Sequence, residues 1–137
     1  MARRRTLAAL VATLALCVAF GAFSWAASPR PGNYSNAKYG ITFKVVKTSA
    51  GKRIAQLFGG FKYKCNEIPL NLQQRIPVRG GRFFYEGQVD DVLGKPAGRL
   101  FFRGRFITRQ KARGVFQVQK GNCDTGKTGF AALRSQQ

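Results

Sequence analysis

The stretch GRFFYEGQVDDVLGKPAGRLFFRGRF, residues 81–106, decides the fold of this chain. Two near-copies of one pattern, GRFFYEG at 81–87 and GRLFFRG at 98–104, lie 17 residues apart. The side chains in each copy alternate with a period of two, which is typical of a β-strand, and the segment between them is rich in turn residues. A repeat this short indicates the two arms of one hairpin, because solenoid repeats run to about 20 residues or more and need several copies.

The alternation within the arms also predicts which side chains share a face of the hairpin. If Phe83 and Tyr85 point into the protein, their partners on the second arm are Phe102, Gly104 and Phe106. A glycine inside a strand, such as Gly104, indicates a bend or a close approach that leaves no room for a Cβ atom. The outward face, including the returning strand, then carries Arg82, Phe84, Glu86, Phe101, Arg103, Arg105, Gln117 and Gln119.

The rest of the chain after Pro31 is also divided into short, alternating segments. The longest stretch there without Gly or Pro is residues 41–50, which is β-branched and therefore a poor helix. Further strands are expected at 41–47, 53–58, 61–65, 115–119 and 128–133, with a short edge strand near 76–78 and a turn over 108–114. Seven or eight short strands predict an all-β fold, either a small antiparallel β-sandwich or a flattened barrel.

The first quarter of the chain has the features of a secretory signal peptide. Arginines at 3–5 precede an apolar run at 7–20, and Ser24 and Ala26 are small residues at the −3 and −1 positions of a cleavage site. An uncleaved membrane anchor is the alternative, because residues 7–27 are about long enough to span a bilayer. The arginines are compatible with export by either the Sec pathway or the twin-arginine pathway. We expect a signal peptide at 1–26, a linker at 27–38, a β-sandwich domain at 39–134, a tail at 135–137, and a secreted or envelope-associated protein.

Two cysteines, Cys65 and Cys123, remain after the leader. In an exported domain an even pair predicts a disulfide, here Cys65–Cys123. Closing a loop of roughly 60 residues would stabilise the fold by about 4 kcal/mol in the chain-entropy model. Two thiols in a chain with no histidine cannot complete a zinc tetrahedron, so we expect no metal site.

The charge of the mature chain predicts anionic partners. Removal of residues 1–26 leaves 111 residues with 21 basic and five acidic side chains, a net charge of +16. Such a charge attracts polyanions over long distances. Anionic wall polymers, acidic lipids and acidic polysaccharides are the expected partners, with nucleic acid bound only incidentally. The turn after the second arm adds Arg109, Lys111 and Arg113, a basic tip, to the outward face of the hairpin. Arginines interleaved with aromatic rings suit the binding of a polyanion or a sugar. The alternative is a charge that only solubilises the domain.

The segment GNCDTGKT, residues 121–128, matches the phosphate-loop pattern G-x-x-x-x-G-K-[ST]. That loop holds phosphates only where it opens into a helix, and nine residues follow Thr128. We therefore expect a turn that anchors Cys123, followed by a strand at 128–133, and no bound nucleotide.

Catalytic residue sets are also scarce. The absence of histidine excludes Ser-His and Cys-His pairs, and the chain has only five carboxylates: Glu67, Glu86, Asp90, Asp91 and Asp124. A glycosidase pair of Glu86 with Asp90 or Asp91 is the remaining alternative. We expect Glu86 to point outward and the aspartates to cap the loop, and hence no enzyme activity and no cofactor.

Several segments together resemble a group of small exported bacterial proteins, mostly actinobacterial, whose role is uncharacterised. The similarity rests on PGNYSN, on Cys65, on IPVRGGRFFYEG, on FRGRFITRQKARGVFQV and on the closing Cys-x-x-Gly from Cys123, and it covers most of residues 31–134. The resemblance implies a β-sandwich with one disulfide and brings no catalytic residues.

The function expected from the sequence is therefore a non-catalytic binding module for an anionic envelope polymer, glycan or surface. The alternative is a structural cell-surface protein that its charge holds at the envelope without a specific ligand. The sequence leaves the oligomeric state open.

Overall fold

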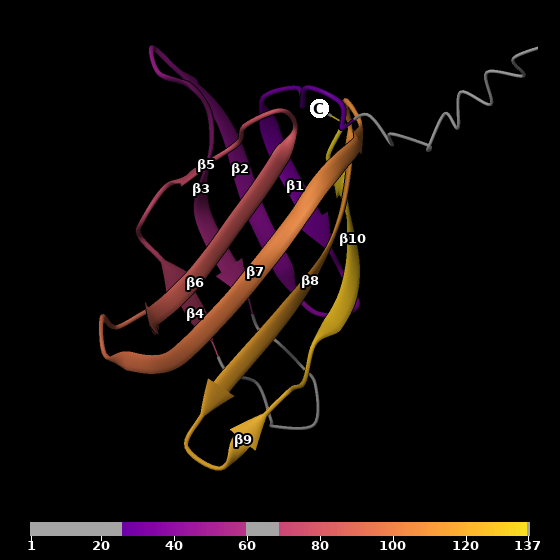
Figure 1. The fold of residues 1–137 in the computed structure, drawn as a ribbon. Coiled ribbons are helices and arrows are strands. Elements are labelled where there is room, and N and C mark those ends of the chain that lie inside the picture. Colours follow the sequence, from indigo (N-terminus) through magenta and orange to yellow (C-terminus); the bar gives the residue numbers. More distant parts are fainter. Residues whose placement is uncertain (1–25, 60–68, 137) are drawn as a thin grey trace, which may run out of the picture.

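The computed structural model of the protein describes residues 26–59 and 69–136. All regular structure in these two ranges is β-strand, which confirms the predicted all-β class (Figure 1). The expected strand at 61–65 and Cys65 lie outside the described residues, so that strand and the Cys65–Cys123 bond stay predictions. The strands are β1 (Gly32–Asn36), β2 (Ile41–Thr48), β3 (Gly51–Gly59), β4 (Leu70–Leu72), β5 (Ile76–Pro77), β6 (Arg82–Asp90), β7 (Pro96–Thr108), β8 (Lys111–Lys120), β9 (Cys123–Asp124) and β10 (Thr128–Arg134).

Eight of these strands pair into a closed antiparallel ring. The order is β10-β1-β2-β3-β4-β6-β7-β8, and β8 returns to β10. Outside the ring, β5 pairs with β3, and β9 forms a hairpin with β8. The seam between β4 and β6 is short, with one register pair between Asn71 and Asp90. Closure leaves few unpaired strand edges, which protects a β-protein from edge-to-edge association.

The repeated arms form the hairpin of β6 and β7 (Figure 1). Phe83 lies opposite Gly104 and Tyr85 opposite Phe102, which is the register that the alternation predicts. The next turn is shorter than expected. Only residues 109 and 110 separate β7 from β8, so residues 111–114, predicted as a turn, belong to β8. This extension puts Arg113 on a strand rather than on a loop tip.

Aromatic rings fill the interior of the strand ring. Phe83 stacks on Phe102 with ring centroids 5.0 Å apart, and Phe102 stacks on Phe130 at 5.2 Å. Tyr34 stacks on Phe43 at 5.3 Å. Such pairs contribute roughly 0.5–1.5 kcal/mol each beyond the burial of their area. Because side chains pack this interior, the candidate site lies on the outer surface.

Two segments without a predicted strand contain one. The expected linker at 27–38 holds β1, whose Tyr34 is fully buried, and the segment before the expected edge strand near 76–78 holds β4. The sequence GNYSN is a poor strand by propensity, yet β1 pairs with β2 on one side and with β10 on the other. These pairings outweigh the local preference. The chain before β1 is also fixed, since the Ala27 amide donates to the Phe106 carbonyl at 2.7 Å. Residues 27–38 are therefore part of the folded domain, and the linker prediction is wrong.

Candidate binding site on the outer face of β6, β7 and β8

The candidate site is built from outward side chains of three neighbouring strands that lie in register. One row across β6, β7 and β8 is Arg82, Arg105 and Arg113. The next row is Phe84, Arg103 and Val115, and the third is Glu86, Phe101 and Gln117. Neighbouring strands lie about 4.8 Å apart, and same-face residues along a strand are separated by about 6.7 Å. Because the outward residues of neighbouring strands lie side by side, the alternating sequence places cationic and aromatic side chains next to one another on this face.

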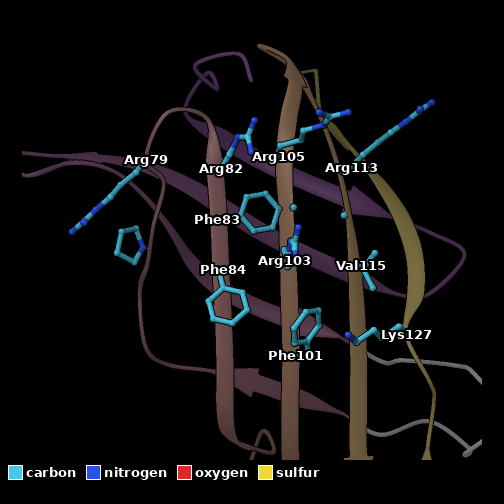
Figure 2. Close-up of a pocket in the computed structure, with 13 residues that line it drawn as sticks. Arg79, Arg82, Phe83, Phe84, Phe101, Arg103, Arg105, Arg113, Val115 and Lys127 are labelled. Carbon is cyan, nitrogen blue, oxygen red and sulfur yellow. The ribbon is translucent and has the colours of Figure 1, made fainter. Parts of the chain in front are cut away.

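This face is hollowed into a groove of about 1010 Å³ (Figure 2). Side chains of β6, β7 and β8 form most of its walls, and three further residues, Pro77 of β5, Arg79 and Lys127, complete it. Its lining comprises Pro77, Arg79, Arg82, Phe83, Phe84, Phe101, Arg103, Gly104, Arg105, Arg113, Gly114, Val115 and Lys127. Six of these residues are cationic, and none is acidic.

The guanidiniums of the groove have no anionic partner within residues 26–59 and 69–136. Arg82, Arg103, Arg105 and Arg113 are exposed, and none of them forms an ion pair or a side-chain hydrogen bond there. Glu86, on the same face, does not line the groove. Their N–H donors therefore face water, available for carboxylate, sulfate or phosphate oxygens, which a guanidinium binds with two parallel hydrogen bonds.

Two aromatic rings, Phe84 and Phe101, lie beside the arginines in this groove. Phe84 is 55% exposed, an unusual value for a phenylalanine, and meets Phe101 edge to face with ring centroids 5.7 Å apart. The ammonium group of Lys127 lies 4.9 Å from the centre of the Phe101 ring, a cation–π contact. Phe101 is thus covered by its neighbours, whereas Phe84 presents apolar surface to a ligand (Figure 2).

The backbone beneath the groove depends on a pair of facing glycines. Gly104 of β7 lies opposite Gly114 of β8, both at inward positions. A Cβ atom on Gly104 would lie 2.4 Å from the Arg113 carbonyl oxygen and 2.6 Å from Cζ of Phe83. The space that a side chain would need is occupied by the backbone of β8 and by the Phe83 ring of β6, so the expected close approach at Gly104 comes from its two paired strands. The glycine pair therefore allows the core to pack directly under the strands that carry the arginines.

The two glutamines predicted for this face lie at its other end and are bound to a carboxylate. Gln117 donates to one oxygen of Asp124 at 2.8 Å, and Gln119 donates to the other at 3.0 Å. The Gly126 amide also donates to Asp124, at 2.7 Å. These hydrogen bonds lower the pKa of the Asp124 carboxyl below its ordinary value. The Gln117 and Gln119 side chains have the largest effects, and the Gly126 backbone amide follows. The glutamine amides thus have an internal acceptor, unlike the arginines.

The three residues predicted as a basic tip separate in the structure. Arg113 lines the groove, opposite Arg105. Lys111 lies at the start of β8, opposite Leu133 of β10, and Arg109 lies in the turn, where its carbonyl accepts the Arg30 amide at 2.8 Å. Neither Lys111 nor Arg109 lines the groove.

Conversely, Arg79 and Lys127 also line the groove, and sequence reasoning missed both. Arg79 is placed beside β6 by a tight turn through Gly80 and Gly81, in which it pairs with Arg82, so the Gly-Gly pair was a local signal for it. Lys127 is placed by the long-range pairing of β10 with β8, which no local pattern specifies.

The segment GNCDTGKT forms turns between strands. It contains β9 and leads into β10, which confirms the predicted strand after Lys127. Gly121 and Gly126 have φ values of 57° and 66°, a conformation that suits glycine. Thr125 is buried, and its hydroxyl accepts the Val118 amide at 3.0 Å. The loop thus binds its own strand neighbour and does not open into a helix.

Of the two aspartates expected to cap the hairpin loop, Asp91 has this role. Asp90 instead ends β6, and its side chain makes no hydrogen bond within the described residues, so that part of the prediction is wrong. One oxygen of Asp91 accepts the Leu93 amide at 2.8 Å and the Lys95 amide at 2.9 Å. The Lys95 hydrogen bond is the first cause of a pKa below the ordinary value for this carboxyl. No group of three or more His, Cys, Asp or Glu side chains in the described part of the chain could hold a metal ion.

Comparisons with known proteins add no relatives: no family model, curated protein or solved structure matches this chain. Among the residues that the structure describes, no helix is both long enough and apolar enough to cross a membrane.

Proposed function

We propose that this chain is a secreted, non-catalytic module that binds an anionic polymer or glycan of the cell envelope in the groove over β6, β7 and β8. One observation carries the proposal: four exposed arginines, without an anionic partner in the described residues, line the same groove as the exposed ring of Phe84. Guanidiniums supply paired hydrogen bonds to oxyanions, and the ring supplies an apolar surface for the uncharged part of the ligand.

The alternative function is a structural surface protein held by charge alone, and the net charge of the chain favours it. Charge-only attachment depends on total charge and weakens steeply with added salt. It does not require an aromatic ring among the arginines. The exposure of Phe84 is therefore the feature that separates the two candidates, because such a ring adds nothing to a purely electrostatic contact.

Salt-controlled binding assays test the proposal. The full-length mature protein would be titrated with wall polymers, acidic glycans and anionic vesicles at about 0.15 M salt and again at about 0.5 M. We expect a preferred ligand that keeps part of its affinity at high salt, and a loss of roughly three- to tenfold on Phe84→Ala, about 1 kcal/mol. The proposal would be contradicted if salt weakened the binding of all ligands equally and if Phe84→Ala left the affinity unchanged.

The matched control is Phe58→Ala, which removes another exposed ring, 40% exposed, from β3, away from the groove. A binding module should not respond to this change. Thermal unfolding of both variants would establish that each one folds.

Of the two predicted folds, the proposal adopts the flattened barrel, and the pairing of each strand of the eight-strand ring with two neighbours supports this choice. We also keep the Cys65–Cys123 disulfide as part of the proposal. Cys123 packs against the core, in a position from which a bond would fix the chain close to β10.

A further inference from the structure

A second, smaller groove continues the first one around the barrel. It has a volume of about 400 Å³ and lies between the turn after β1 and the strands β8 and β10. Arg113 and Gly114 line both grooves, so the two hollows meet at β8. The far end of the second groove carries Lys38, whose ammonium group lies 5.1 Å from the centre of the Tyr39 ring.

The row of arginines leads directly from one groove to the other. Arg82, Arg105 and Arg113 are register partners across β6, β7 and β8, and Arg113 lies opposite Ala131 of β10. The carbonyl of Ala131 accepts a hydrogen bond from the Asn36 side chain at 2.6 Å, which fixes the turn that bears Lys38 beside β10. Four strand-to-strand steps separate β6 from β1, or roughly 20 Å along the surface. Gly129 and Ala131 of β10, which line the second groove, are small residues and leave this path open.

We infer that the ligand is a linear anionic polysaccharide that runs across the strands, from Arg82 over Arg113 to Lys38. This inference rests on the proposed function and assigns its ligand class and direction. Cations along the path are complementary to acidic groups repeated along a chain, whereas a single compact anion would meet only one part of it.

The aromatic geometry favours a polysaccharide over single-stranded nucleic acid. Successive bases bind by stacking on a series of aromatic rings. Phe84 and Phe101 cross at 78°, and Lys127 covers Phe101, so the two rings do not form parallel platforms. The isolated face of Phe84 suits the C–H face of one sugar ring, and arginines suit the sulfate or carboxylate groups beside it.

The test is the dependence of affinity on ligand length. Heparin fragments, from disaccharide to dodecasaccharide, would be titrated calorimetrically into the mature protein at about 0.15 M salt. We expect affinity to rise with length and to level off once the fragment spans about 20 Å. Lys38→Gln should weaken binding of the long fragments roughly three- to fivefold and leave the disaccharide unaffected. Ala131→Glu, which places a carboxylate in the middle of the path, should act in the same direction and more strongly.

The control is Lys44→Gln, which removes an equal charge from an exposed position on β2 that lines neither groove. Equal effects of Lys38→Gln and Lys44→Gln, or affinity independent of length, would overturn the path while leaving the proposed function intact. Failure of every fragment to bind, together with no ligand in the salt-controlled screen, would overturn both. A single-stranded oligonucleotide that binds more tightly than a heparin fragment of equal charge would overturn the choice of polysaccharide.

Discussion

The outer face of β6, β7 and β8 has two ends that differ in how their polar groups are satisfied. At the arginine end, Arg82, Arg103, Arg105 and Arg113 have no anionic partner among the described residues. At the amide end, Gln117 and Gln119 share the Asp124 carboxylate. Strand β8 contributes to both ends, and β9 supplies Asp124 to the amide end. The comparison indicates that partner availability, rather than residue polarity, separates a candidate binding surface from a stabilising network.

The largest effect is expected at the facing glycines of β7 and β8, which lie between the two rows of arginines at the arginine end. In Gly104→Ala, the new Cβ would meet the Arg113 carbonyl at 2.4 Å and the Phe83 ring at 2.6 Å. Overpacking against a backbone atom and a core ring should lower the free energy of unfolding by about 3 kcal/mol. Urea unfolding measures this loss. Gly129→Ala is the control, since the nearest atom there is 3.9 Å away, and its stability should stay close to that of the wild type.

A charge change at the arginine end should affect binding far more than one polar truncation at the amide end. Arg105 lies in the middle of the row between Arg82 and Arg113. Arg105→Glu replaces a guanidinium with a carboxylate and should weaken binding of a polyanion by roughly tenfold or more. Gln119→Ala, on the same face, should change affinity less than twofold. Calorimetric titration at constant salt compares the two, and similar losses would remove the distinction between the ends.

The sequence was sufficient to predict the parts of this face that depend on local pattern. Period-two alternation and the repeated arms predicted the hairpin, its register and the outward position of Phe84 and Arg103. The contribution of Lys127 and the meeting of two grooves at Arg113 depend on pairing between β8 and β10, which no local pattern specifies. Similarly, β1 owes its conformation to two distant partners.

Removal of the carboxylate at the amide end should have a smaller effect, seen in stability rather than in binding. Asp124→Asn leaves one carbonyl oxygen where two glutamine amides and the Gly126 amide require acceptors. Thermal unfolding should show a lower midpoint than for the wild type, with a shift well below that of Gly104→Ala. Asp90→Asn is the charge-matched control, because Asp90 is exposed and has no side-chain hydrogen bond within the described residues. A midpoint for Asp124→Asn equal to that of the control would indicate that the amide end contributes nothing.

The smallest effect concerns pH, and it follows from the direction of the Asp124 pKa. Hydrogen bonds from Gln117, Gln119 and the Gly126 amide lower this pKa in the folded protein below the ordinary value of 3.8. The ionised carboxylate is therefore favoured by folding, so its contribution to stability is complete above the ordinary value and decreases as the pH falls through the lowered pKa. The difference in unfolding free energy between wild type and Asp124→Asn should be constant near neutral pH and should shrink below pH 3.8. Urea unfolding from neutral to acidic pH measures it. A difference that grows on acidification would mean that the carboxylate is not the acceptor that holds the amide end together, and the contrast with the arginine end would then need another cause.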